Sequence, residues 1–267
     1  MKFSVLMSLY IKENPEYLRA CFASLVAQTR PADEIVLVFD GAVTPELEAV
    51  VDEFESQLPL KLVKLPQNLG LGKALNEGLL HCSYDWVFRM DTDDICVPER
   101  FEKQTAFINA HPDTIIFGGQ IVEFGQNIND IVAYRNVPTD AVSIVKFTRK
   151  RCPFNHMTVA YQKNAVLDCG GYEDLQEDYY LWIKLIAKKQ QVANLPDILV
   201  YARVGNGMVG RRRGLNHAKA EWRLFKLKYR LGIQGFVSGL FTFALRSASR
   251  LLPTALLKAI YNKFLRK

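Results

Sequence analysis

Three carboxylates within four residues follow an apolar run in the first half of the chain. The run Trp86–Met90 leads into Asp91, and Asp93 and Asp94 come directly after it. An aromatic and β-branched run of this kind predicts a buried strand. Carboxylates at the end of a buried strand are costly unless a cation such as Arg89 or a metal neutralises them. Oxygen ligands suit Mg²⁺ and Mn²⁺, which bridge carboxylates and substrate phosphates, so a site for one of these metals is predicted.

The same cluster has a structural alternative. Asp and Pro favour helix starts, and Pro98 follows the carboxylates closely. An exposed acidic turn that caps a helix near Pro98 would show the same residues without binding anything. The local sequence leaves both interpretations open.

A second acidic pair, Glu177 and Asp178, opens a helical pattern. Acidic residues at a helix N-terminus are favoured by the helix dipole without any function. The functional interpretation is a general base held near an incoming hydroxyl group. A lone histidine, His156, also has two interpretations. It is either a hydrogen-bonded histidine in a packed loop or a functional group.

Two glycine-containing basic segments can approach phosphates. The first, Gly70–Lys73, lacks the spacing of a Walker loop and the third glycine of a dinucleotide fingerprint, so it predicts a tight turn with Lys73 near a phosphate or on the surface. The second, Gly205–Gly214, contains Arg211 and Arg212, and we expect a loop that closes over a diphosphate or a solvated linker.

The elements that position these residues alternate between strand and helix. Strands are predicted at 3–9, 34–39, 60–65 and 86–91, with helices beginning at Pro15, at Pro45 and after the glycine turn. This order predicts a parallel sheet with helices on both faces, whose ligands bind at the carboxyl ends of the strands. Four side chains are expected to converge there: Tyr10, Asp40, Asn68 and Asp91.

The rest of the chain predicts further strands and helices. Helices are expected at 98–110 and 139–150, and strands at 114–124, 130–136 and 192–203, with a short strand that runs through Tyr161. A helical pattern extends from Leu215 to the end. The 267 residues, 49% of them apolar, suit one large α/β domain with or without an appendage. Five cysteines without metal spacing indicate a reducing, cytosolic compartment, and the N-terminus predicts a first strand and no signal peptide.

The net charge of +6 hides an asymmetry. Fifteen of the 34 Lys and Arg residues, but only one of the 28 acidic residues, Glu221, lie from Arg203 onward, so 19 basic and 27 acidic residues precede Arg203. A basic tail suggests an anionic partner: a membrane surface, a polyphosphate or nucleic acid.

The tail favours the membrane among these partners. Its apolar run 236–245 is shorter than the roughly 20 residues that span a bilayer, and basic amphipathic helices predict an anchor in the membrane interface. The alternative is an appendage packed on the catalytic domain or on a second subunit, as in a homo-oligomer. No nucleic-acid partner is predicted, because no recognised binding motif accompanies the charge.

Five motifs in this order resemble the inverting glycosyltransferases of family 2, and among them the bacterial enzymes that build O-antigen and exopolysaccharide repeat units, such as the amylovoran-type enzymes. The motifs are Met7–Tyr10, Val38–Gly41, Asn68–Asn76, Asp91–Asp94 and Glu177–Tyr179. The resemblance implies the GT-A fold, a Rossmann-like and mostly parallel central sheet with helices on both faces, over residues 1–214. Residues of about 1–95 would then form the nucleotide-sugar half and those of about 96–214 the acceptor half, followed by the basic helical tail 215–267.

The resemblance also implies roles for individual residues. Tyr10 and Asp40 would hold the nucleobase, Asn68 and Lys73 would lie by the nucleotide, and Asp91 would face the ribose or the metal. Asp93 would bind Mn²⁺ or Mg²⁺ on the diphosphate, Arg211 and Arg212 would stabilise the leaving group, and Asp178 would be the general base with Glu177 as its substitute. One departure from the family pattern concerns recognition of the nucleobase. Many members carry two acidic residues before the glycine of the second motif, whereas this chain has Phe39 and Asp40.

Together these residues imply a metal-dependent hexosyltransferase. The donor would be a nucleotide sugar such as UDP-galactose or UDP-glucose, and the acceptor a lipid-diphosphate-linked saccharide at the cytoplasmic face of the inner membrane, where the tail would hold the enzyme peripherally. Two alternatives compete with this function. A sugar nucleotidyltransferase would carry a long glycine-rich basic loop after the first strand, and Ser8–Ile11 is not one. A non-catalytic membrane-associated scaffold would not require Asp91, Asp93 and Asp178.

Overall fold

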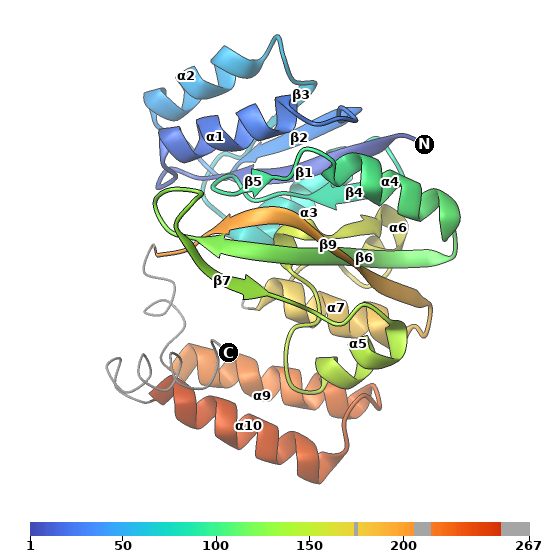
Figure 1. Ribbon diagram of the computed structural model, residues 1–267. Coiled ribbons are helices and arrows are strands. Elements are labelled where there is room, and N and C mark those ends of the chain that lie inside the picture. Colours follow the sequence, from blue (N-terminus) through green and yellow to red (C-terminus); the bar gives the residue numbers. More distant parts are fainter. Residues whose placement is uncertain (174–175, 206–214, 252–267) are drawn as a thin grey trace.

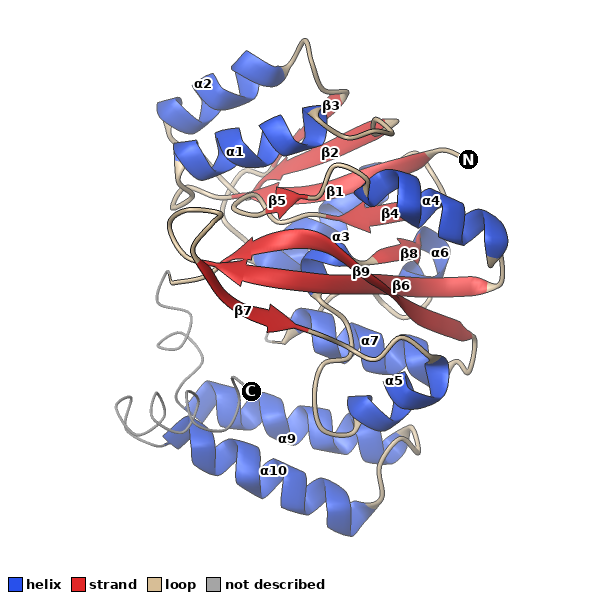
Figure 2. Cartoon of the chain, viewed as in Figure 1, coloured by secondary structure: helices blue, strands red, loops and turns tan. Residues whose placement is uncertain are grey.

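The computed structural model describes residues 1–173, 176–205 and 215–251 (Figure 1). Within these ranges the chain forms one nine-stranded sheet covered by helices on both faces, with a helical hairpin beside it (Figure 2). The strands are β1 (Phe3–Leu9), β2 (Glu34–Phe39), β3 (Leu60–Lys64), β4 (Trp86–Arg89), β5 (Ile95–Cys96), β6 (Thr114–Phe124), β7 (Ile131–Arg135), β8 (Ala160–Gln162) and β9 (Gln191–Arg203). The α/β class predicted from the alternating pattern is confirmed.

The sheet is parallel in its first half and mixed in its second. Its strand order is β3-β2-β1-β4-β8-β6-β9-β5, with β7 paired to β6. Strands β1 to β4 pair in parallel, so their carboxyl ends meet at one edge. The expectation of a mostly parallel sheet needs correction beyond β4: β8 runs antiparallel to both β4 and β6, β7 to β6 and β5 to β9, while β6 and β9 are parallel. The short turn between β6 and β7 permits only an antiparallel pair.

Two apolar layers hold the helices to the sheet. The helices of the body are α1 (Pro15–Val26), α2 (Pro45–Phe54), α3 (Leu71–His81), α4 (Arg100–Ala110), α5 (Ala141–Thr148), α6 (Lys163–Leu167) and α7 (Glu177–Ala187), with a single 3-10 turn at His156–Thr158. Val5 and Met7 of β1 pack in one layer with α1, α2 and α4, whereas Leu6 packs in the other with α3, α6 and α7. Successive strand residues point to opposite faces, so a buried parallel strand is apolar on both.

Most predicted element boundaries are close to the observed ones. Asn14 caps α1 by accepting a 2.8 Å hydrogen bond from the amide of Glu16, and Pro15 occupies the first turn, as predicted. Helix α2 ends at Phe54, whereas its amphipathic pattern in the sequence continues to Leu58, and α4 begins at Arg100, two residues after Pro98. The sequence missed β5 and α6, which contain two and five residues and are too short to show a period.

The C-terminal region forms an antiparallel helical hairpin beside α7 and α5 (Figure 1). Helix α9 (Leu215–Arg230) and helix α10 (Phe236–Leu251) are joined by a turn in which Gly232 has φ of 70°. The predicted helical tail is confirmed over the described residues. Among those residues, no helix is both long enough and apolar enough to cross a membrane.

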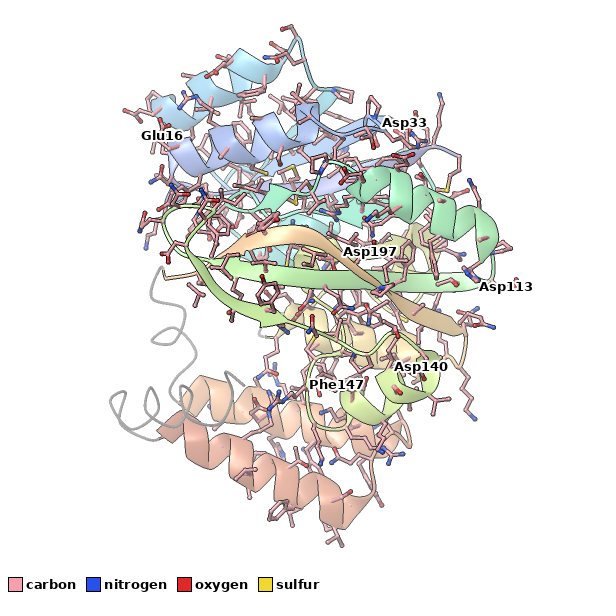
Figure 3. The ribbon with its side chains drawn as sticks, in the orientation of Figure 1. Glu16, Asp33, Asp113, Asp140, Phe147 and Asp197 are labelled. Carbon is pink, nitrogen blue, oxygen red and sulfur yellow. The ribbon has the colours of Figure 1, made fainter. Side chains whose placement is uncertain are left out.

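All acidic residues except Glu221 precede the hairpin in the sequence, as the charge count shows. Asp140 caps α5 by accepting a 2.9 Å hydrogen bond from the amide of Ser143, and Asp197 of β9 pairs with Lys103 of α4 at 2.6 Å. Both acidic residues are labelled in Figure 3, together with Glu16, Asp33 and Asp113. The hairpin, by contrast, is basic.

Candidate active site

A cleft of about 730 Å³ opens at the carboxyl ends of the parallel strands. Its lining includes Tyr10 after β1, Asp40 after β2, Asn68 before α3, and Asp91 and Asp93 after β4. The predicted convergence of the first four of these residues is therefore confirmed, and Asp93 joins them. Parallel pairing explains this convergence. The strands that precede these residues have their carboxyl ends at the same edge of the sheet.

The carboxylate cluster is neutralised only in part by the protein. Arg89, which is fully buried, forms an ion pair with Asp91 Oδ1. Asp93 has no ion-pair partner among the described residues, and burial together with the carboxylates of Asp91 and Glu13 raises its pKa to about 7. The sequence did not single out Glu13, which reaches the cleft from the loop after β1 and accepts a 2.7 Å hydrogen bond from Thr92 Oγ1.

The third carboxylate, Asp94, is structural and buried. Its Oδ1 accepts a 2.8 Å hydrogen bond from the amide of Arg203 at the end of β9, while its Oδ2 has no partner among the described residues. The guanidinium of Arg203 donates to the carbonyl of Asp93 at 3.2 Å and lies over the ring of Tyr17. The helix-cap alternative is wrong, because the N-terminus of α4 has no side-chain cap and the cluster faces the cleft.

Asp40 holds the loop that enters α3. Its Oδ1 accepts from the amide of Leu69 at 2.6 Å, and its Oδ2 accepts from Asn68 Nδ2 at 2.9 Å and from the amide of Gly70 at 3.1 Å. A carboxylate offers about four acceptor sites, so one is left on Oδ1 for a ligand. Gly70 has φ of 87° at the start of α3, which explains the glycine of the predicted tight turn.

The structure does not place every predicted nucleotide contact in the cleft. Lys73 is exposed on the first turn of α3 and is absent from the lining of the cleft. Arg211 and Arg212 lie outside the described residues, so their predicted roles stay predictions.

Glu177 and Asp178 form the first turn of α7, which packs next to α3. A side chain at Gly72 of α3 would meet the Cβ of Glu177 at 3.3 Å, which shows how closely the two helices approach. Burial and the charges of Asp178 and Asp91 raise the pKa of Glu177. Asp178 is half-buried and accepts a hydrogen bond from the thiol of Cys152, with a sulfur–oxygen distance of 3.6 Å.

His156 packs its ring against those of Tyr172 and Trp182, with ring centroids 5.6 Å and 6.1 Å apart. Burial and the charge of Arg89 lower the pKa of His156 to about 4, and the charges of Asp91 and Asp178 oppose this shift. Its Nε2 is shielded from solvent and has no hydrogen-bond partner among the described residues. The structure therefore shows a histidine packed among aromatic rings, and a functional role for His156 stays a prediction.

The carboxylates fit a divalent metal that is bound partly by the protein and partly by the phosphate oxygens of a nucleotide. Within the described residues, no three His, Cys, Asp or Glu side chains are grouped to hold a metal by themselves. Mg²⁺ and Mn²⁺ at phosphate sites need fewer than three protein ligands, since one or two carboxylates and the phosphate oxygens suffice. The raised pKa of Asp93 and the unpartnered Oδ2 of Asp94 mark an excess of negative charge that a cation would relieve.

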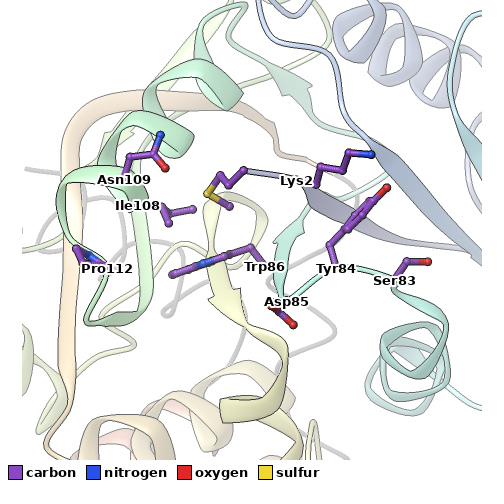
Figure 4. Close-up of a pocket in the computed structure, with 9 residues that line it drawn as sticks. Lys2, Ser83, Tyr84, Asp85, Trp86, Ile108, Asn109 and Pro112 are labelled. Carbon is purple, nitrogen blue, oxygen red and sulfur yellow. The ribbon is translucent and has the colours of Figure 1, made fainter.

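A second cavity, of about 520 Å³, lies at the opposite ends of β1 and β4. Lys2, Tyr84 and Trp86 contribute to its walls (Figure 4). None of the predicted site residues that the structure describes lines it, and Asp85 is the one carboxylate in its described lining. The chemistry predicted from the sequence therefore belongs to the cleft at the carboxyl ends.

Comparison with protein families and curated proteins agrees with this geometry. The model of the family described as "Glycosyl transferase family 2" matches residues 4–176, which include the cleft and end just before α7. An "Uncharacterized glycosyltransferase" of Haemophilus influenzae is 82% identical over the full length of both chains. The amylovoran biosynthesis glycosyltransferase AmsE of Erwinia amylovora is 45% identical over 98% of each chain. An Escherichia coli "UDP-Gal:alpha-D-GlcNAc-diphosphoundecaprenol beta-1,3-galactosyltransferase" is 38% identical over 100% of this chain and 97% of its own.

Solved structures show that the fold is that of the GT-A type. Staphylococcus aureus TarS 1-349, in complex with UDP-GlcNAc, matches with a TM-score of 0.69 at 20% identity, over 99% of this chain and 76% of its own. A mannosyltransferase of Pyrobaculum calidifontis, in complex with GDP-Man and Mn²⁺, matches with a TM-score of 0.63 at 17% identity, over 98% and 79%. Since the family model covers more than half of the chain and two close relatives are more than 40% identical over nearly its whole length, this protein is a glycosyltransferase of family 2.

Proposed function

We propose that the protein transfers a hexose, with inversion, from a UDP-sugar to a hydroxyl group of a lipid-diphosphate-linked saccharide in the synthesis of a surface polysaccharide. One observation carries the proposal: Asp91 and Asp93 line the cleft together with Leu71 of α3, and the acidic first turn of α7, which carries Asp178, packs against the next residue of α3, Gly72. A donor bound in the cleft would present its sugar toward α7, where an acceptor can approach.

The names of the relatives support the choice of substrates. UDP-galactose and a diphosphoundecaprenol-linked GlcNAc are named for the relative of 38% identity, and amylovoran biosynthesis for the relative of 45% identity. UDP-galactose and UDP-glucose are therefore the first donors to test. In the cleft, Tyr10 would stack on the base, and the remaining acceptor site of Asp40 would meet the uracil N3–H.

The donor's diphosphate would lie against the carboxylate cluster with a divalent metal. Asp93, together with Asp91, would hold Mn²⁺ or Mg²⁺, and the bound metal would neutralise the charge of the departing UDP. Arg89 keeps Asp91 in place through their ion pair, and Arg203 fixes the turn through the carbonyl of Asp93. In this proposal Lys73, Arg211 and Arg212 add positive charge near the phosphates.

The acceptor's hydroxyl group would be activated from α7. Asp178 takes the proton of the acceptor's hydroxyl group while the oxygen of that hydroxyl group attacks the anomeric carbon of the donor sugar. The bond to the diphosphate oxygen breaks on the opposite face with its electron pair, so UDP leaves and the anomeric configuration inverts. Glu177, whose pKa is raised by burial and by its acidic neighbours, is the substitute if Asp178 is not the base.

The hairpin would hold the enzyme peripherally at the cytoplasmic face of the inner membrane, where a lipid-linked acceptor is available. Five large apolar residues of α10 are exposed: Phe236, Val237, Leu240, Phe241 and Leu245. The outer face of α9 carries exposed basic residues: Lys219, Arg223, Lys226 and Arg230. An apolar face flanked by cations suits the interface of an anionic bilayer.

Calorimetric binding of UDP, GDP, CMP and dTDP, each with and without Mn²⁺, tests the donor site. The proposal requires UDP to bind most tightly and with metal, and Asp93→Ala to abolish the metal-dependent part. If no nucleoside diphosphate binds with metal, the donor assignment fails. A transfer assay with UDP-galactose and a GlcNAc-diphosphate-lipid separates the alternatives: a nucleotidyltransferase would form a nucleotide sugar from a sugar phosphate, and a scaffold would bind UDP without turnover.

A further inference from the structure

Helix α9 buries two charged residues against the first turns of α7. Glu221 and Lys228 are only 3% and 4% exposed, and they lie seven residues apart, on one face of the helix. Lys228 Nζ donates to the hydroxyl of Tyr179 at 2.6 Å, and that hydroxyl donates to the carbonyl of Thr148 at 2.7 Å. Buried charges are costly, so a helix that served only to hold the hairpin on the body would be better built from apolar residues.

Glu221 links α10 to the residue just before α7. Its Oε1 accepts from Gln176 Nε2 at 3.2 Å and from Arg246 Nη2 at 2.9 Å, and its Oε2 accepts from Arg246 Nε at 2.7 Å. Arg246 is itself held by the carbonyl of Lys150 at 2.8 Å. This bidentate pair fixes the direction of the Glu221 carboxylate.

Gln176 has an uncommon backbone conformation at a critical place. Its φ of 57° and ψ of 40° are left-handed, which non-glycine residues rarely adopt. It occupies the N-cap position of α7 but makes no side-chain cap, although its carbonyl accepts the 3.0 Å hydrogen bond from the amide of Tyr180. Its side chain instead donates to Glu221, so the start of α7 is tied to α9 while the amides of its first turn receive no side-chain cap.

We propose that Glu221 is a positioning residue for the transfer reaction: clamped by Arg246, it holds Gln176 in the left-handed conformation and thereby sets the first turn of α7, which carries Glu177 and Asp178. This inference rests on the proposed function, in which Asp178 is the base. The hairpin is then part of the catalytic unit as well as a membrane-facing element. Through its hydrogen bond to Glu221, the side chain of Gln176 controls where the Asp178 carboxylate lies relative to the donor.

Steady-state kinetics with UDP-galactose and a GlcNAc-diphosphate-lipid test the inference. Glu221→Ala and Gln176→Ala should each lower kcat about 10- to 100-fold, the loss expected from a misplacement of about 1 Å. The donor KM and the affinity for UDP should stay within about twofold, because the cleft is built by other elements. The double variant should be no slower than the slower single variant, since both remove the same hydrogen bond.

Two further variants separate positioning from a loss of folding. Gln176→Gly leaves the Glu221–Arg246 pair intact and adopts the left-handed conformation without strain, yet it lacks the side-chain bond and should lose kcat as Gln176→Ala does. Arg149→Ala removes another link between the body and the hairpin, the 3.1 Å bond from Arg149 Nε to the carbonyl of Ile233, and should keep wild-type kcat. Hydrogen exchange of the α7 amides at 179–181 should rise in Glu221→Ala and Gln176→Gly, but not in Arg149→Ala.

The outcomes distinguish failure of this inference from failure of the proposed function. If Asp178→Asn abolishes turnover while Gln176→Gly and Glu221→Ala turn over at the wild-type rate, the positioning role is wrong and the base assignment stands. The positioning role is also wrong if the losses of kcat add in the double variant Glu221→Ala with Gln176→Ala. It is wrong as well if the single variants lose UDP affinity in parallel with kcat. If Asp178→Asn itself turns over normally, the base assignment fails, and the positioning role fails with it.

Discussion

The backbone amide of Arg203 donates a 2.8 Å hydrogen bond to Asp94 Oδ1 across 109 positions of sequence. This bond joins the last strand of the sheet to the acidic turn after β4. The other oxygen, Oδ2, is buried without a partner among the described residues, and burial together with the charges of Asp93 and Asp91 raises the pKa of Asp94 well above its ordinary value. Asp94 therefore matters to the fold as an acceptor, and its negative charge is a cost.

Asp94→Asn should keep the acceptor and remove the charge. We expect its free energy of unfolding, measured in urea without divalent metal, to equal or exceed that of the wild type. Asp94→Ala leaves the amide of Arg203 unsatisfied and should lower the free energy by about 1–3 kcal/mol. Equal destabilisation by both substitutions would show that the charge itself is required.

Asp40→Ala should weaken UDP binding by about 10- to 100-fold, because it removes three hydrogen bonds that hold residues 68–70 at the edge of the cleft. Isothermal calorimetry measures the affinity. Glu48→Ala, which removes an exposed acid paired with Lys64, is the control and should bind UDP normally. An unchanged affinity in Asp40→Ala would mean that the loop keeps its shape without the carboxylate.

Asp178→Asn should lower kcat by about 10²- to 10⁴-fold, the usual effect of a lost general base. UDP affinity should be unchanged, since Asp178 does not line the donor cleft. Glu177→Gln is the matched comparison and should cost less. The reverse order of the two effects would assign the base to Glu177.

The triple substitution Val237→Glu, Phe241→Glu and Leu245→Glu should abolish sedimentation with anionic vesicles, since these residues are 81%, 71% and 64% exposed on one stripe of α10. Leu80→Glu with Val142→Glu, at exposed apolar positions of the body, is the control and should leave binding intact. Deletion of residues 236–267 should release the protein as well. Continued membrane binding by both the triple variant and the deletion would refute the anchor.

Lys228 should make stability rise with pH above neutrality. Burial and the charge of Arg246 lower its pKa from 10.5 to about 7, so between these values the unfolded chain binds a proton that the folded protein does not. The free energy of unfolding of the wild type, relative to Lys228→Met, should then increase by about 1 kcal/mol per pH unit from pH 7 toward pH 10. Urea titrations at pH 7, 8 and 9 measure it, and parallel curves for the two proteins would contradict the shift.

Residues adjoining strand ends were predictable as a group. Tyr10, Asp40, Asn68 and Asp91 were expected at one edge because parallel strands bring their carboxyl ends together, and all four line the cleft. The glycine turn and the capped starts of α1 and α2 depend on neighbouring residues only, so local sequence was sufficient for them.

Contacts across long stretches of sequence were not predictable. Glu13 and Arg203 join the site from a loop and a strand whose pairing the periodicity does not reveal. The antiparallel pairs of the second half depend on which strand β8 meets, and that choice is made by packing between distant segments.

By itself, then, the sequence determined the alternating elements, the two acidic clusters, the basic helical tail and the family, because each depends on residue types at short spacing. Tertiary structure alone decided that Asp94 is an internal acceptor, that Asp40 holds a loop, and that Glu221 reaches the residue before α7. The physical reason is that a buried polar group must find its partner in space. The partner of a buried carboxylate is set by how the layers pack, and no local pattern encodes it.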